Sequence, residues 1–331
     1  GLWLMQWLVF GGIFLSFYLF LRLLDRRLDI TSVTMIAAVG IACSISCSFY
    51  KPELFSALFF AWTVFIFFCF KIKRIPYLLY LYPLLFALWV NLHGAFLVGF
   101  VFLALAFAGE FLNRIFFPRE SWTAKELIHF AAAGVLSGAA ALLNPYGADY
   151  LLGLLPTIKI AIVKSNTENL ILAHSSLWSY LKNLSFPFFY INVTVWMMTL
   201  LMAAVLVISV YEFFKKRAFD FTMLIAGAVL YWKGMQTGRA SYFSLFAFFF
   251  ILLYLLVHRM KIGNFHGGAT VMSLLVFVFL SAGVSYINIR YQPDNTWFGR
   301  GLDDFVPAKE AAFLKKYRLD GPIFNDYLSG G

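Results

Sequence analysis

The distribution of basic residues between long apolar segments is the feature that most constrains this chain. About ten apolar segments are long enough, or nearly so, to cross a lipid bilayer. Cytoplasmic loops of membrane proteins retain Lys and Arg, so a regular alternation of basic and non-basic connections orients the whole molecule. Every second connection is basic, and these connections contain Arg26 with Arg27, Lys71 to Arg74, Arg114 to Lys125, Lys215 to Arg217, and Arg259 with Lys261. The pattern predicts that these connections face the cytosol and that both ends of the sequence lie outside.

The composition excludes an ordinary soluble domain, because 62% of the residues are hydrophobic and only 13% are charged. The net charge of +10 resides in short clusters beside apolar segments. We therefore attribute it to orientation and lipid headgroup contact rather than to nucleic acid. The predicted fold is an all-α polytopic membrane protein. Spans are expected near 3–23, 31–49, 53–70, 76–92, 95–116, 127–144, 187–211, 220–233, 239–257 and 269–288.

Two regions differ from this membrane domain of residues 1–290. Residues 145–186 form a long connection predicted to lie outside, either as an interfacial helix with a substrate-side loop or only as a linker. Residues 291–331 are polar and predict the beginning of a small extracytoplasmic α/β domain, with a short helix from Pro307 and a strand near Ile323. Because the sequence begins with Gly and ends in a Ser-Gly-Gly run, we expect a fragment of a longer protein.

The sequence predicts no disulfide framework and no metal site. Cys43, Cys47 and Cys69 lie within apolar segments, where thiols usually act as small apolar fillers. The histidines are scattered along the chain without the spacing of metal ligands. No cofactor is identified, and a need for a divalent metal is not readable from the sequence.

Four polar residues stand at predicted outer ends of spans. Asn91 and His93 either cap a helix in the headgroup region or line an outward cavity and donate hydrogen bonds to a sugar or phosphate. Asn144 and Tyr146 belong first of all to a turn, because Pro and Gly stop a helix there. They also place hydrogen-bonding groups on the same side as His93, which makes all four candidate substrate-binding residues.

Charged residues at outer connections form a second set of candidates. Lys233 and Arg239 flank a short outer connection, where cations run against the orientation bias. They bind either a ligand phosphate or lipid headgroups. Glu53 is a scarce outer carboxylate that is either a catalytic acid or base, or the ion-pair partner of Lys51. Glu110 lies near the inner end of its span and is expected to face the bundle or the cytosol.

Several segments, in matching order, resemble bacterial membrane glycosyltransferases of the GT-C type. They are Trp89 to Gly94, the following apolar segment ending at Glu110, Leu143 to Gly147, Gly238 with Arg239, and Pro307 to Tyr327. The resemblance implies an inverting enzyme that takes a sugar from a polyprenyl-phosphate donor on the outer side of the inner membrane. It also implies an acidic base in the first outer loop. The first span here runs in the direction of the family's second span, so that loop is expected to be absent, and Glu53 would fall in the next outer loop.

The expected function is transfer of a sugar from a polyprenyl-phosphate donor to an acceptor of the cell envelope. The expected partners are this donor, membrane lipids and an unidentified acceptor, with no nucleic acid. Arg239, with Lys233 and His93, would hold the donor phosphate. A transporter or flippase of a lipid-linked sugar and a non-catalytic envelope scaffold are the alternatives.

Overall fold

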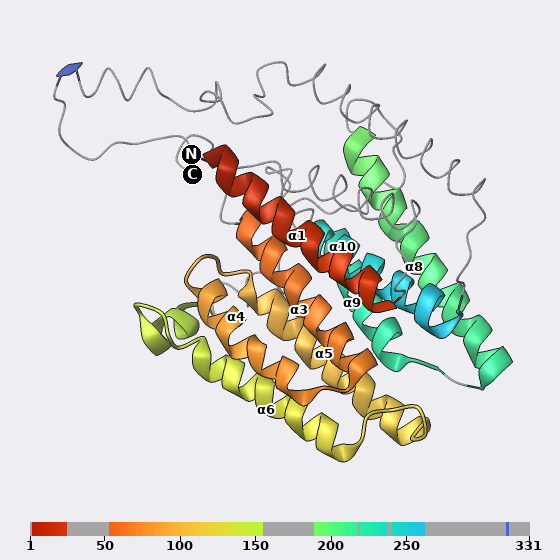
Figure 1. The fold of residues 1–331 in the computed structure, drawn as a ribbon. Coiled ribbons are helices and arrows are strands. Elements are labelled where there is room, and N and C mark those ends of the chain that lie inside the picture. The colour runs from red at the N-terminus through yellow and green to blue at the C-terminus, as the bar shows by residue number, and fades with distance from the viewer. Residues whose placement is uncertain are drawn as a thin grey trace.

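The structure is a computed structural model that describes residues 2–24, 53–154, 189–217, 219–236, 240–261 and 316–317. Within these ranges the chain is helical and contains no strand (Figure 1). The elements are α1 (Leu2–Leu24), α3 (Glu53–Lys73), η1 (Pro76–Tyr80), α4 (Leu81–Val90), α5 (Phe96–Phe116), α6 (Ala124–Ala140), α8 (Phe189–Lys216), α9 (Phe221–Gln236), α10 (Ser241–Leu253) and the π-helical segment η6 (Tyr254–Arg259).

The helices support a membrane protein but not the predicted number of spans. In the described part of the chain, four helices are long and apolar enough to cross a membrane, namely Glu53–Lys73, Phe96–Phe116, Val195–Lys215 and Ser241–Arg259. Gly11–Leu24 and Pro76–Val90 are shorter apolar helices. The expected spans 31–49 and 269–288 lie outside the described residues, whereas every other expected span coincides in position with a helix. The count of ten spans is therefore not supported.

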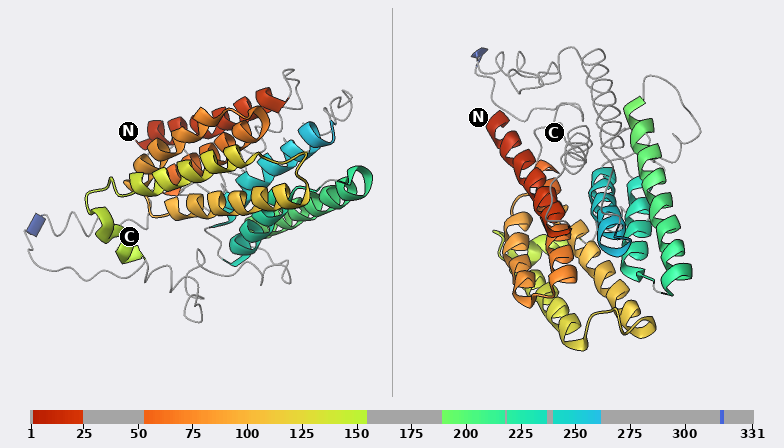
Figure 2. Two further views of the ribbon diagram at one scale, coloured as in Figure 1. Left: turned by 90° about the horizontal axis from the view of Figure 1, so that it is seen from below. Right: turned by 45° about the vertical axis from the view of Figure 1, so that its right-hand side comes forward.

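Helices joined by a short connection run in opposite directions. Phe20 near the end of α1 contacts Phe68 near the end of α3, so these two helices are parallel. Lys71 of α3 reaches Glu110 of α5, which makes α5 parallel to α3 as well. The segment η1–α4, which joins α3 to α5, and α6, which follows α5, run back in the opposite direction, and α9 does the same between α8 and α10 (Figures 1 and 2).

Phenylalanine rings fill the middle of the bundle. Phe60 of α3 packs edge to face against Phe102 of α5 and Phe243 of α10, with ring centroids 5.8 and 4.9 Å apart. Phe67 and Phe250 continue the layer and are fully buried. Lipid tails are as apolar as these side chains, so close packing rather than exclusion of water supplies the stabilisation here.

One end of the bundle, called here the basic end, collects the cations of several connections. Lys71 at the end of α3, Arg114 in the last turn of α5, Lys215 in α8 and Arg259 in η6 all belong to it. Arg74, Arg217 and Lys261, which follow α3, α8 and η6, have φ values of 58°, 54° and 54°. This left-handed conformation terminates a helix. A cation at this position also interacts favourably with the negative, C-terminal end of the helix dipole. The basic connections within the described residues are thus grouped at one end, as their alternation predicts, whereas Arg26 and Arg27 lie outside these residues.

The opposite end, called here the His93 end, is formed by two predicted turns. Residues 91–95 make a tight turn between α4 and α5, with the His93 amide donating to the Trp89 carbonyl at 3.1 Å. Residues 144–147 form the second turn, where Gly147 has a φ of +53° that glycine adopts without steric cost. Both turn predictions are confirmed. After this turn, residues 147–154 are helical, whereas the rest of the 145–186 connection falls outside the described ranges.

The predicted C-terminal α/β domain receives no support. Of residues 291–331, the structure describes only Lys316 and Tyr317, both helical. The expected strand near Ile323 lies outside the described residues.

Candidate functional site

A chain of hydrogen bonds at the His93 end joins three segments of the fold. The indole Nε1 of Trp89 in α4 donates to the hydroxyl of Ser56 in α3 at 2.8 Å. The same hydroxyl lies 2.8 Å from Nδ1 of His93, in the turn between α4 and α5. Ser56 and Trp89 are fully buried, and His93 is half-buried. The buried Ser56, itself held by Trp89, therefore fixes the position of the His93 imidazole.

The hydrogen bond between Ser56 and His93 can run in either direction, according to the tautomer of the imidazole. An indole N–H can only donate, so the Ser56 oxygen accepts from Trp89. Where the Ser56 hydroxyl donates its proton to His93, Nδ1 is the acceptor and the neutral imidazole carries its own proton on Nε2. In that tautomer Nε2 of His93 is a hydrogen-bond donor, while Ser56 itself is buried.

Glu53 lies close to this chain along α3. It is the first residue of the helix and precedes Ser56 by one helical turn, so the two residues occupy the same face. The Glu53 side chain is half-buried. The structure therefore places the one carboxylate that the sequence nominated on the same side of the bundle as His93.

The side-chain amides of Asn91 and Asn144 form hydrogen bonds with backbone groups in and beside the two turns. Nδ2 of Asn91 donates to the carbonyls of Ala87 and Leu143, at 2.7 and 2.8 Å, and thereby ties the two turns together. Nδ2 of Asn144 donates to Ala141 and Gly147, and its Oδ1 accepts from the Tyr146 amide at 2.9 Å. These contacts agree with the capping and turn interpretations. Tyr146 is 72% exposed, and a substrate role for all three residues stays a prediction.

The structure describes one of the two cations predicted to bind a phosphate, Lys233. Lys233 lies in the last turn of α9, at the His93 end of the bundle. Its side chain is half-buried and has no hydrogen-bond or ion-pair partner among the described residues. No hydrogen bond joins it to His93 in the described part of the chain. Arg239 lies outside the described residues.

The densest group of charges is at the basic end and was not predicted as a site. Lys71 of α3 forms ion pairs with Glu110 of α5 and with Asp220 before α9, the second at 3.0 Å. Thr222 donates to Glu110 at 2.8 Å, and Asn113 donates to Asp220 at 3.0 Å. These five buried residues, called here the charged cluster, connect three helices.

Part of this cluster could have been found in the sequence. Asp220 precedes an apolar run and caps α9, accepting from the Thr222 amide at 3.2 Å. Glu110 is a charge within an apolar segment and Lys71 directly follows one, and such charges mark either a buried pair or a functional site. The pairing itself joins residues far apart in the chain and has no signal in a single sequence.

Among the residues described, no group of three or more His, Cys, Asp or Glu side chains is arranged to hold a metal ion. Comparison of the chain with known protein families, with curated proteins and with solved structures finds no match. The function of the chain is therefore inferred from the geometry at the two ends of the bundle and from the resemblance of the motifs.

Proposed function

We propose that this chain belongs to a membrane glycosyltransferase of the GT-C type that takes a sugar from a polyprenyl-phosphate donor. The observation that carries the proposal is the chain from Trp89 through Ser56 to His93, which holds the imidazole of His93 at one end of a membrane bundle. Two features of the sequence also support the proposal: the order of the motifs and the cations Lys233 and Arg239. With the basic end toward the cytosol, this site opens on the outer side of the inner membrane.

The chemistry assigned to each residue follows from its hydrogen-bonding capacity. His93 Nε2–H, Lys233 and Arg239 bind the donor phosphate and stabilise the charge that develops on it. The resemblance gives the role of general base to a carboxylate of the first outer loop, which is expected to be absent here; within this chain we assign that role to Glu53, which accepts the proton of the acceptor hydroxyl. The acceptor oxygen forms a bond to the anomeric carbon, the bond from this carbon to the phosphate oxygen breaks, and the polyprenyl phosphate leaves with the electron pair. Attack opposite the leaving group inverts the anomeric configuration.

A transporter of a lipid-linked sugar is the second candidate, and the charged cluster is the observation in its favour. Buried ionisable groups inside membrane bundles commonly line transport paths. Along α3, however, Ser56 and Lys71 are separated by about 22 Å, at roughly 1.5 Å per residue. Buried rings of Phe60, Phe67 and Phe102 fill the space between these levels. This aromatic layer favours a one-sided site.

The two candidates are separated by assays on the protein in lipid nanodiscs and proteoliposomes. The glycosyltransferase is expected to bind undecaprenyl phosphate but not undecaprenol, and to release undecaprenyl phosphate from an undecaprenyl-phosphate sugar. His93→Ala is expected to weaken binding of undecaprenyl phosphate about tenfold, the value of one charge-assisted hydrogen bond. Glu53→Gln is expected to leave this binding unchanged and to stop sugar release.

His129→Ala is the matched control, because His129 lies in the second turn of α6, near the basic end, and interacts with Tyr80 at 2.9 Å. It is expected to alter neither measurement. Absence of undecaprenyl phosphate binding in the parent protein would contradict the proposal. Passage of intact lipid-linked sugar across proteoliposomes without cleavage would identify the transporter instead.

A further inference from the structure

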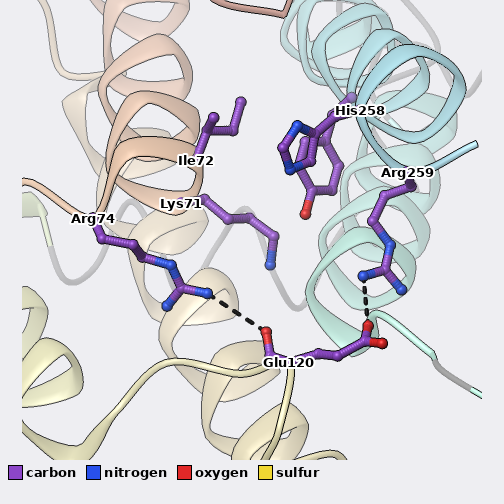
Figure 3. Close-up of a pocket in the computed structure, with 7 residues that line it drawn as sticks. Lys71, Ile72, Arg74, Glu120, His258 and Arg259 are labelled. Carbon is purple, nitrogen blue, oxygen red and sulfur yellow. Dashed lines mark hydrogen bonds and ion pairs between the residues drawn. The ribbon is translucent and has the colours of Figure 1, made fainter. Parts of the chain in front are cut away.

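A pocket at the basic end is lined mainly by side chains that carry or can carry positive charge. Its volume is about 350 Å³, within the roughly 300–1,000 Å³ typical of small-molecule sites. The described lining residues are Lys71, Ile72, Arg74, Glu120, Tyr254, His258 and Arg259 (Figure 3). The pocket is at the opposite end of the bundle from His93, so a ligand bound in it is independent of the proposed function.

Two helical segments and one connection build the pocket. Lys71 and Arg74 come from the end of α3, and Tyr254, His258 and Arg259 all come from η6. A π-helical segment is rare, and such segments occur frequently at functional sites. Arg74 follows α3 with the left-handed backbone of a helix end, and its side chain lines the pocket.

Glu120 occupies the space between the two arginines. Its Oε2 accepts from Arg259 Nη1 at 2.7 Å, and its backbone carbonyl lies 3.5 Å from Arg74 Nη2 (Figure 3). The Glu120 side chain is 51% exposed and lies in the connection between α5 and α6. Trp122 anchors this connection through its buried ring against Phe70. The carboxylate is thus an exposed group that pairs with Arg259, while the backbone carbonyl of the same residue faces Arg74.

The remaining carboxylates near the pocket lie behind the cations. Glu110 and Asp220 pair with Lys71, and the buried Glu212 accepts from Arg259 Nε at 3.2 Å. Glu126 pairs with Arg74 at 3.3 Å. None of these four lines the pocket. An external anion that displaced the Glu120 carboxylate would therefore replace its contact with Arg259, while the four other carboxylates keep their ion pairs with the cations.

We propose that this pocket binds a phosphate group between Arg74 and Arg259, in place of the Glu120 carboxylate. Arginine matches the tetrahedral oxygens of phosphate with paired N–H donors, and Tyr254 and His258 add polar contacts from η6. The phosphate belongs either to the headgroup of an anionic phospholipid in the adjoining leaflet or to a soluble phosphate compound. Glu120 holds the site closed when no phosphate is present.

Opposite changes in affinity are expected from two substitutions. Arg74→Gln removes one donor group and is expected to lower phosphate affinity about tenfold. Glu120→Gln removes the competing charge and is expected to raise the affinity severalfold, a gain that misfolding cannot produce. Arg119→Gln is the matched control, because Arg119 is an exposed cation of the same connection that does not line the pocket. It is expected to behave like the parent protein.

Two measurements distinguish the sources of the phosphate. Native mass spectrometry of the full chain, released from nanodiscs of phosphatidylglycerol and phosphatidylcholine, reports retained phosphatidylglycerol. Equilibrium dialysis with inorganic phosphate or glycerol 3-phosphate reports soluble ligands. Binding of either ligand, with affinity highest in Glu120→Gln and lowest in Arg74→Gln, supports the proposal, and the ligand that binds identifies the source of the phosphate. Absence of both ligands from the Glu120→Gln protein, or an equal loss in Arg74→Gln and Arg119→Gln, would overturn it.

Discussion

Replacing Lys71 with methionine is expected to lower the free energy of unfolding by about 3–5 kcal/mol, the cost of breaking a buried ion pair. Lys71 is the ammonium that faces both Glu110 and Asp220, and all three side chains are buried. Without it, two carboxylates remain close together in a low-dielectric interior. The measurement is the midpoint of unfolding in mixtures of SDS and a mild detergent, compared between the variant and the parent protein.

Lys73→Met is the matched control, because Lys73 lies two residues later in the same helix and is exposed. It is expected to change the midpoint little, since exposed charges contribute about 1 kcal/mol or less. Adding Glu110→Gln to Lys71→Met is expected to restore part of the lost stability, because one unmatched charge is removed. Equal tolerance of Lys71→Met and Lys73→Met would show that the charged cluster does not hold the bundle together.

The sequence predicted the parts of the fold that depend on local patterns. Long apolar runs fix the positions of helices such as α3 and α5, and the residues at 91–94 and 144–147 fix the turns. The alternation of basic connections predicted that they share one end. These signals depend on hydrophobicity, turn chemistry and charge, which neighbouring residues express without tertiary contacts.

The rest depends on contacts between distant residues. Ser56 is an ordinary small residue in an apolar run, and only packing of α3 against α4 shows that it orients His93. The pairing of Lys71 with Asp220 likewise joins residues of separate helices.

Replacing Gly109 with valine is expected to separate α5 from α9 at the charged cluster and to lower the free energy of unfolding by about 3 kcal/mol, the upper part of the range for overpacking. A Cβ atom at Gly109 would collide with the backbone Cα and N of Thr222 as well as with its side chain. The helices can relieve this collision only by moving apart. That movement would also break the hydrogen bonds from Thr222 to Glu110 and from Asn113 to Thr222.

Gly134→Val provides the matched comparison, because Gly134 of α6 has no atom within 4 Å of a built Cβ. Both substitutions place the same side chain in a helix interior, so their difference isolates the α5–α9 contact. Unfolding midpoints are expected to fall for Gly109→Val and to stay within about 0.5 kcal/mol of the parent for Gly134→Val. Because the obstacle at Gly109 is backbone, combining Gly109→Val with Thr222→Ala is expected to give no recovery. Recovery in this double variant would mean that the side chain of Thr222, and not a close approach of the two helix backbones, requires glycine at position 109.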